Sequence, residues 1–357
     1  MAVTTGGRAT GAPTGPVTSG TSNANVSQRE DLANFISMIT RDETPFMASI
    51  GKSKATQIYH EWQTDELAAP GDSRIAEGVD FVAPTAGGSS SAGEYGTGFT
   101  DAGPNRTRLG NYTQINGKTI AVSGTKRAVD QAGVADEYAY QLKKRGTEMR
   151  RDMEKNMVAD YQVASGSGIR SAGGFQSWIN GATVENNNAT AAATTGAGTH
   201  APSIPLDADR VSLSLADVDA VMQSIYEAGG KATKIMVSPK LRRDFSDLMQ
   251  SETNVRRNID MDGKLRQSVD IYMSDFGDLM VVPNYIMGLA TDADADLDKA
   301  DTAALVYDPS WFSVATLRPL SEVDVGQKGD SMVGQMVEEW TLQCNNPSGC
   351  GAIYGLK

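Results

Sequence analysis

Two histidines are the side chains of this sequence best suited to acid–base or nucleophilic chemistry. His60 falls within residues 55–67, whose alternating polar and apolar side chains predict a strand, and His200 falls in a low-complexity segment. A catalytic histidine must be held by a third group while it faces a nucleophile. Neither segment predicts such a rigid arrangement. We therefore expect His60 on a strand surface, with a small hydrolase using His60 as the less favoured alternative.

The two cysteines, Cys344 and Cys350, lie in the segment CNNPSGC. A structural zinc site needs four nitrogen or sulfur ligands, usually in tighter pairs. No other cysteine or histidine pair lies near these two in the sequence, and two cysteines cannot build a disulfide framework. The sequence therefore predicts a turn that carries two ordinary thiols and no metal.

An acidic segment, DADADLD at 292–298, resembles the start of a calcium-binding loop. Leu297 stands where such a loop requires glycine, and Ala303 stands where it requires a bidentate glutamate. The sequence also lacks a phosphate-binding P-loop and a dinucleotide-binding glycine motif. We expect an exposed acidic loop, no cofactor and no enzymatic activity.

Charge and hydropathy exclude other classes of protein. The chain has 357 residues and a formal net charge of −12, which disfavours tight binding of nucleic acid. It contains no apolar run long enough to span a membrane. Residues 1–28 carry one charge, Arg8, and lack the apolar region of a secretory signal, so we expect a cytoplasmic origin.

Long polar segments alternate with the predicted elements. Residues 1–28 are rich in Gly, Thr, Ala, Pro and Ser and predict a flexible arm. Strands are predicted within 55–67 and 106–125, and the 38 residues between them, 68–105, are rich in glycine. A loop of this length is uncommon in a compact domain, so we expect an arm that needs a partner surface.

Residues 131–164 contain no proline and predict the longest helix, on the order of 50 Å. Basic residues cluster in its middle and alternate with Glu148, Asp152 and Glu154, which predicts a solvated or salt-bridged face. A role for this cluster between subunits is the alternative. Further along, a helix capped by Ser214, a strand at 234–238, a helix from Pro239 and a strand pair within 269–284 predict an α/β unit, followed by strands at 304–317 and 332–344.

Several segments, in this order and spacing, resemble the major capsid proteins of tailed bacteriophages, which have the Hong Kong 97-type fold, and in particular the podovirus-type subfamily. The segments are DETPFMASIG (42–51), NRTRLGNYTQI with VSGT (105–125), EYAYQLKKRGTEMRRDMEKNMV, MVSPKLRRDFS (236–246), SDFGDLMVVPN (274–284), and VYDPSWFSVATLRPL with GQKGDSMVGQMVEEWTLQCNNPSG (306–349). The resemblance covers nearly the whole chain outside the low-complexity stretches.

The resemblance implies an α+β fold of the Hong Kong 97 type with five parts. These are an N-terminal arm (1–48), an extended loop called the E-loop with its flanking strands (49–125), a peripheral domain with a spine helix (126–205), an axial domain (206–305), and returning strands of the peripheral domain (306–357).

The implied function is self-assembly, as hexamers and pentamers, into an icosahedral virion shell around double-stranded DNA, in the cytoplasm of a host bacterium. Implied partners are a portal protein, a separate scaffolding protein, decoration proteins and packaged DNA bound non-specifically. An encapsulin-like cellular shell is the alternative. Residues 68–105 contain no lysine, so covalent joining of subunits through an E-loop lysine is not expected.

The resemblance also implies which side chains contact neighbouring subunits, all in the E-loop region and the spine helix. They are Arg74, Asp80, Phe81, Tyr95, Phe99, Arg106, Arg108, Arg150 and Arg151.

Overall fold

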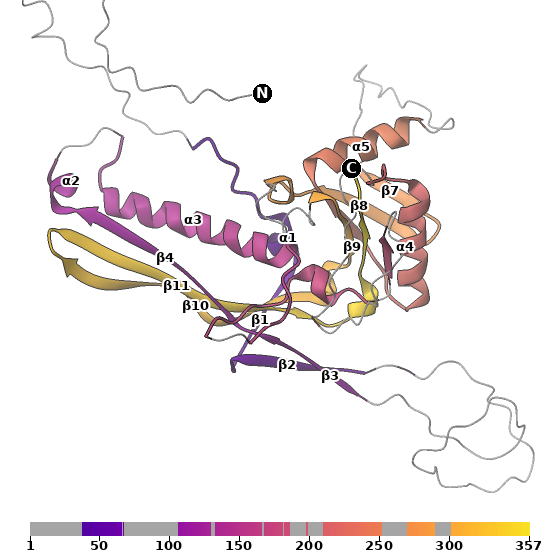
Figure 1. The fold of residues 1–357 in the computed structure, drawn as a ribbon, viewed down its shortest axis with the longest axis horizontal. Helices are drawn as coiled ribbons and strands as arrows, with labels where there is room; N and C mark the ends of the chain where they lie inside the picture. The colour runs from indigo at the N-terminus through magenta and orange to yellow at the C-terminus, as the bar shows by residue number, and fades with distance from the viewer. Residues whose placement is uncertain are drawn as a thin grey trace, which may run out of the picture.

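The computed structural model describes residues 38–65, 67, 106–129, 133–165, 168–180, 182–185, 198, 210–251, 270–289 and 301–357. These residues form a long sheet that carries one helix, a second sheet with two helices, and a two-stranded arm that projects from their junction (Figure 1). The predicted mixed helix and strand content is confirmed. The acidic segment 292–298 lies outside the described residues.

The long sheet has four strands. Their order is β1 (Gly51–Lys54), β10 (Phe312–Lys328), β11 (Ser331–Cys344) and β4 (Gln114–Ser123). β10 and β11 form an antiparallel hairpin, whose pairing shifts register at three places along β10. β1 runs parallel to β10 but pairs only with residues 313–316, so from residue 318 onward β10 has no strand on its other side within the described residues.

The spine helix α3 (Glu137–Val158) lies along one face of this sheet (Figure 1). Its methionines 149, 153 and 157 are buried, and Met149 packs with Ile120, Val122 and Met336 of the sheet. The helix is shorter than the predicted 131–164. It begins after Asp136, whose carboxylate accepts the Tyr138 N–H, and stops at Ala159, whose backbone is extended. Its 22 residues span about 33 Å.

The second sheet has six strands and is covered on one face by two helices. Its order is β5 (Ala182–Glu185), β12 (Gly351–Tyr354), β9 (Ala304–Tyr307), β6 (Lys234–Val237), β8 (Gly277–Pro283) and β7 (Ile271–Ser274); the helices are α4 (Leu215–Glu227) and α5 (Pro239–Ser251). Ser214 caps α4 as predicted, and the strand pair predicted within 269–284 is the β7–β8 hairpin. Residues 306–357 contribute to both sheets. β10 and β11 belong to the long sheet, whereas β12 pairs with β9 in the six-stranded sheet.

The other face of the six-stranded sheet meets the long sheet through an aromatic cluster. Phe46, Phe175, Tyr307 and Phe312 lie with ring centroids 5.0–6.2 Å apart and are almost fully buried. Such contacts favour edge-to-face geometry and fix the two sheets relative to each other.

Phe46 belongs to the short helix α1 (Pro45–Ser49). Residues 38–44 are not helical, and Pro45 opens α1. Proline suits this position because its missing N–H has no partner in the first turn of a helix. The remaining short helices are α2 (Gly124–Ala128), η1 (Phe175–Trp178), η3 (Met287–Leu289), η4 (Pro309–Trp311) and η5 (Pro347–Gly349).

Candidate subunit-contact surfaces

The arm consists of β2 (Tyr59–Thr64) and β3 (Thr107–Tyr112) and projects away from both sheets (Figure 1). The two strands pair antiparallel from Tyr59 opposite Tyr112 to Thr64 opposite Thr107, as the alternating sequence predicted. At the outer end, Arg106 pairs with Asp65 at 3.2 Å and Arg108 with Glu61 at 3.7 Å. All four side chains are exposed, so these ion pairs add little to stability.

The root of the arm is held by buried polar groups. The Trp62 indole N–H donates to the Cys344 carbonyl at 2.8 Å. The fully buried Asn111 side chain donates to the Leu342 carbonyl at 2.7 Å and accepts the Gly173 N–H at 2.9 Å. Both strands of the arm are therefore fixed to the end of β11.

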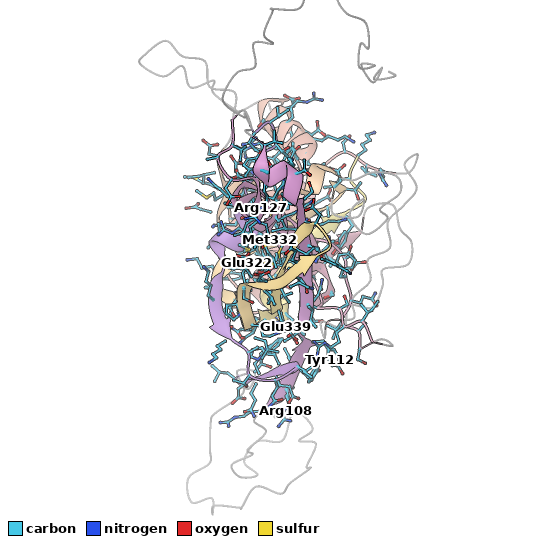
Figure 2. The ribbon with its side chains drawn as sticks, turned by 90° about the vertical axis from the view of Figure 1, so that its left-hand side faces the viewer. Arg108, Tyr112, Arg127, Glu322, Met332 and Glu339 are labelled. Atoms are coloured by element: carbon cyan, nitrogen blue, oxygen red, sulfur yellow. The ribbon has the colours of Figure 1, made fainter. Side chains whose placement is uncertain are left out.

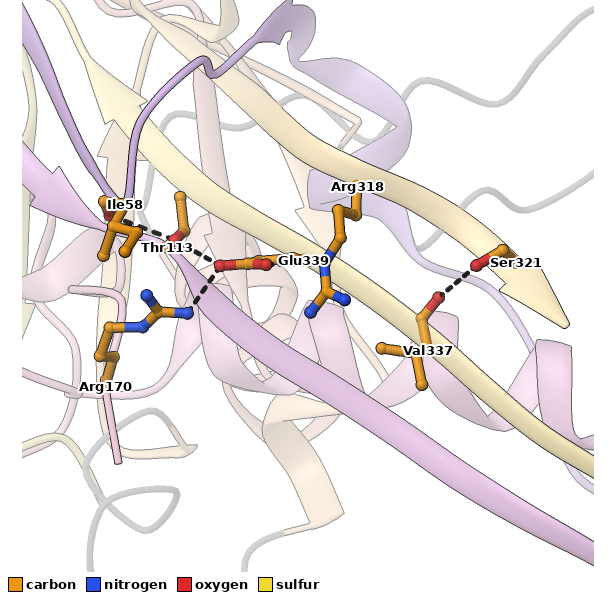
Figure 3. A network of polar contacts seen from close by, with 7 residues as sticks. All are labelled: Ile58, Thr113, Arg170, Arg318, Ser321, Val337 and Glu339. Atoms are coloured by element: carbon orange, nitrogen blue, oxygen red, sulfur yellow. Dashed lines mark hydrogen bonds and ion pairs between the residues drawn. The ribbon is translucent and has the colours of Figure 1, made fainter. Parts of the chain in front are cut away.

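A second anchor is built around Glu339 of β11 (Figure 3). This buried carboxylate lies 2.7 Å from Arg170 Nη2 and 2.8 Å from Arg318 Nε, and it accepts the Thr113 hydroxyl at 2.8 Å. The Thr113 N–H donates to the Ile58 carbonyl at 2.8 Å, just before the arm begins. The network joins β10, β11, the loop after α3 and both sides of the arm root.

Gly110 lets the Tyr59 ring lie across the arm. A Cβ at position 110 would come within 2.6 Å of that ring, which is tilted against Tyr112 with centroids 4.6 Å apart. We expect Gly110→Ala to displace the ring and to lower the free energy of unfolding by about 1 kcal/mol, the scale of an aromatic pair. Urea unfolding and near-ultraviolet circular dichroism measure this effect.

Gly51→Ala is the matched control for that substitution. It also places a Cβ on a strand glycine, but its nearest neighbour is the Phe312 carbonyl oxygen at 3.5 Å, an ordinary van der Waals contact. A similar loss of stability in both variants would contradict the role assigned to Gly110.

The face of the long sheet that points away from α3 carries almost no charge along β4 and the hairpin. The exposed alternate residues of β4 and β10, with their partners on β11, are small, β-branched or amide side chains. They are Ile115, Gly117, Thr119, Ala121, Ser123, Ser321, Val323, Val325, Val333, Gln335 and Val337. We call this surface the neutral sheet face.

Figure 2 looks at the molecule from the hairpin end, with Arg127 of α2 above, Glu339 lower down and Arg108 of the arm at the bottom. The neutral sheet face extends from Ile115, opposite Glu339 at the arm root, to Ser123, opposite Ser331 at the free end of the hairpin. Such a nearly uncharged face contrasts with a chain in which 21% of residues are charged.

The charged face predicted for α3 is confirmed in part. Lys118 of β4 pairs with Glu148 at 3.3 Å and Asp152 at 2.7 Å, and Arg145 pairs with Glu148 at 2.6 Å. These contacts lie within one subunit. Burial raises the pKa of Glu338, beneath this helix, to about 7.

Glu154 was wrongly grouped with the solvated residues of that helix. It is fully buried, and its partners come from segments distant in the sequence. Sequence reasoning also missed Asn111, Thr113 and Glu339, because strand alternation gives no signal for a buried polar side chain.

The predicted contact residues fall into two groups. Arg106 directly precedes β3 and Arg108 lies on it, both near the outer end of the arm, while Arg150 is exposed and Arg151 half-buried on α3. The other five lie outside the described residues: Arg74, Asp80, Phe81, Tyr95 and Phe99.

Of the residues considered for catalysis or metal binding, His60, Cys344 and Cys350 lie within the described ranges and His200 lies outside them. His60 lies on β2 of the arm, and its Nε2 is 3.1 Å from Oε1 of Gln343 on β11. Cys344 and Cys350 are buried free thiols, and burial raises the pKa of Cys344 well above its usual range. The described ranges contain no cluster of His, Cys, Asp and Glu that could hold a metal ion. Among the helices described, none combines the length and apolar character needed to cross a membrane.

A spine helix on a long sheet, a projecting two-stranded arm and a second α/β sheet define a shell subunit of the Hong Kong 97-like class. Bacteriophage PhiM1, in the asymmetric unit of its mature capsid, has a chain with this fold (TM-score 0.54, 12% identity, 92% of this chain and 91% of that chain). The holo-SrpI encapsulin complex of Synechococcus elongatus PCC 7942 contains another (TM-score 0.51, 9% identity, 93% of each chain).

The chain belongs to the SU10 major capsid protein family, whose model matches residues 15–357. It is also 27% identical over 258 residues to the major capsid protein of Escherichia phage Phieco32, covering 64% of this chain and 68% of that protein. The resemblance to tailed-phage major capsid proteins is thereby confirmed, and the encapsulin alternative is not better supported. The family is one of structural proteins that form the virion shell from many copies of themselves.

Proposed function

We propose that this protein assembles as hexamers and pentamers into the icosahedral shell of a tailed phage, around its double-stranded DNA. The arm is the observation that carries the proposal. It is fixed at its root by buried polar groups, yet its outer end contacts neither sheet in the described part of the chain. A rigidly aimed extension of this kind is suited to reach a second subunit.

The neutral sheet face is the proposed binding surface for the arm of a neighbouring copy. A charged surface would have to lose its hydration on contact, whereas valine, alanine, threonine and glycine side chains are covered at little cost. The arm and the neutral sheet face are different surfaces of one chain, so the contact is heterologous, and it closes into a ring of five or six when the rotation between neighbours is a fifth or a sixth of a turn. In this proposal Arg106 and Arg108 lie at the joint, whereas Arg150 and Arg151 lie on α3, across the sheet from the neutral sheet face, and are proposed to contact a different neighbour.

The six-stranded sheet is proposed as the axial domain, and the long sheet with α3 as the peripheral domain. β5 and β12 then belong to the axial domain, since both pair within the six-stranded sheet. The remaining partners are proposed from the resemblance: a portal protein, a separate scaffolding protein, decoration proteins, and packaged DNA held non-specifically near an acidic shell. Assembly would take place in the cytoplasm of the host bacterium, without catalysis.

Electron microscopy of the full-length protein, expressed alone and with the scaffolding protein of the same phage, tests the proposal. We expect closed particles of uniform diameter, with five- and sixfold clusters after averaging, in at least one of the two preparations. Small oligomers in both preparations, together with virions whose shell consists of another protein, would overturn it. Particles filled with a cellular enzyme would favour the encapsulin alternative.

A further inference from the structure

The turn between β11 and β12 carries both cysteines of the chain. Cys344 is the last residue of β11, and Cys350 directly precedes β12, so the pair marks the point where the chain passes from the long sheet to the six-stranded sheet. Both side chains are fully buried, in the same hydrophobic cluster as Trp62 and Tyr307. Both are free thiols in this structure.

The fold brings the two sulfur atoms together beside one residue of this turn. The Cys344 thiol accepts the Asn346 N–H, and it is hydrogen-bonded to the Cys350 thiol. Cys350 Sγ lies 3.2 Å from the Pro347 carbonyl oxygen and 4.0 Å from that of Asn346. The Asn346 side-chain oxygen closes the turn by accepting the Gly349 N–H at 3.1 Å. Thiols that point towards each other in this way meet the first geometric requirement of a disulfide.

No other residue type competes for either sulfur. The sequence has no third cysteine, so each thiol has one cysteine partner within the chain. In the ranges that the structure describes, no group of His, Cys, Asp and Glu is suited to hold a metal ion. The chemistry that two adjacent thiols share is their oxidation to a disulfide.

We propose that Cys344 and Cys350 form a redox modification site, at which a peroxide or a small-molecule disulfide oxidises the two thiols to an intramolecular disulfide. With hydrogen peroxide, the first sulfur attacks the O–O bond and becomes a sulfenic acid, and one oxygen leaves as water. The second sulfur attacks the sulfenic sulfur, the S–S bond forms, and the other oxygen leaves as water. Two thiols are thereby oxidised and one peroxide is reduced. With oxidised glutathione, the reduced products are two molecules of glutathione.

The turn itself controls access to the sulfurs. Its middle residues, 345–348, are half-exposed, whereas the cysteines on either side are buried. The Asn345 N–H donates to the Trp311 carbonyl at 2.8 Å, and the Asn180 N–H donates to the Pro347 carbonyl at 3.2 Å. Local opening of these contacts uncovers the sulfurs while both sheets stay folded, so we expect oxidation over minutes to hours.

The disulfide fixes a junction on which three parts of the molecule depend. Cys344 belongs to the long sheet, β12 belongs to the six-stranded sheet, and the Trp62 indole of the arm donates to the Cys344 carbonyl at 2.8 Å. A bacterial cytoplasm keeps thiols reduced, whereas a virion outside the cell meets oxidising conditions. The timing, unlike the bond itself, rests on the proposed function: the subunit assembles with thiols, and the released particle acquires the bond.

Peptide mapping of the full-length protein tests the bond. The folded protein is incubated with hydrogen peroxide or oxidised glutathione and is then alkylated with iodoacetamide in urea. Residues 329–357 form one tryptic peptide with both cysteines, because no lysine or arginine lies between Lys328 and Lys357. We expect this peptide to be lighter by two hydrogen atoms and to resist alkylation until dithiothreitol is added. Full alkylation after prolonged oxidation, or disulfides between chains in place of the internal bond, would overturn the proposal.

A redox titration measures whether the fold favours the bond. Folded and urea-unfolded protein are equilibrated with mixtures of oxidised and reduced glutathione until each is half oxidised. The folded chain should reach this point under conditions roughly tenfold to a hundredfold less oxidising, since the fold already holds the thiols in contact. By the same linkage, oxidation should raise the thermal unfolding midpoint by about 3 °C. Equal titrations of the two states would overturn the proposal.

Cys344→Ala and Cys350→Ala are the matched controls, because each removes one sulfur and leaves the other in place. Neither variant should lose two hydrogen atoms or gain thermal stability on oxidation, and a gain in either would overturn the assignment to the bond. Where a variant fails to fold, the titration of the wild-type protein decides alone. These tests need only the folded chain. Their failure leaves the proposed shell contacts standing, and a failure to form particles leaves the disulfide standing.

Discussion

Replacing residues 65–106 with the dipeptide Asn-Gly is expected to leave the subunit folded and to abolish shell assembly. Thr64 and Thr107 are opposite each other at the outer end of the arm, and their hydroxyl oxygens are 2.6 Å apart. A two-residue Asn-Gly turn can therefore close β2 and β3 into a hairpin. The buried anchors at Asn111, Trp62 and Glu339 are untouched by the deletion.

Circular dichroism and thermal unfolding should show a subunit of nearly unchanged stability, while electron microscopy and light scattering should show the loss of particles. A variant in which residues 68–105 are scrambled at constant length and composition is the control that separates the reach of the arm from its sequence. Normal shells formed by the deletion variant would show that residues 65–106, which extend the arm, are not needed for assembly, and would contradict the proposed contact with a second subunit.

Glu339→Ala is expected to produce the largest loss of stability among single substitutions at the arm root. The change leaves Arg170 and Arg318 without their counter-charge and Thr113 without its acceptor. Breaking a buried pair by removing one partner costs roughly 3–5 kcal/mol, and about 3 kcal/mol is expected here because Arg318 is half exposed. Urea unfolding of the unassembled subunit measures this loss.

Glu61→Ala provides the comparison for Glu339→Ala, because Glu61 pairs with Arg108 on the exposed part of the arm. That loss should stay within about 1 kcal/mol. Similar losses in the two variants would mean that the network around Glu339 does not anchor the arm. A shell that assembles from Glu339→Ala with an unaltered diameter would show that arm direction is set elsewhere.

The local elements could be predicted from the sequence where one periodicity governs them. The alternation of polar and apolar side chains predicted the strands of the arm. The helix α4 was predicted from its cap, Ser214, and from the apolar residues at helical spacing, which are Val218, Val221, Met222 and Ile225. The partners of each strand could not be predicted in the same way. β4 pairs with β11, more than two hundred residues further along, and β1 pairs with β10, and neither pairing has a local signal.

The proposed contact surfaces were predictable only in outline. The glycine-rich segment 68–105 indicated an arm and lies outside the described residues, while Arg106 and Arg108 lie at the outer end of the strand pair on either side of it. Glu154 shows where prediction from helical spacing fails. Its position among basic residues indicated an exposed, salt-bridged face of the helix, but the side chain is buried. Its real partners, Phe46 and Asn284, lie 108 and 130 residues away. Only the folded chain brings these groups together.

The irregular pairing of β10 bears on how subunits avoid aggregation before the shell exists. A long strand with one open edge can pair with any other exposed strand, which makes it a hazard at the concentrations reached during infection. The register of β10 shifts after Thr316, after Arg318 and after Asp324, along the part of the strand that has no partner on its other side. Each shift bends the strand and interrupts the row of backbone donors and acceptors. The open edge of β10 in the described part of the chain is therefore bent and interrupted, which disfavours indiscriminate pairing between unassembled subunits.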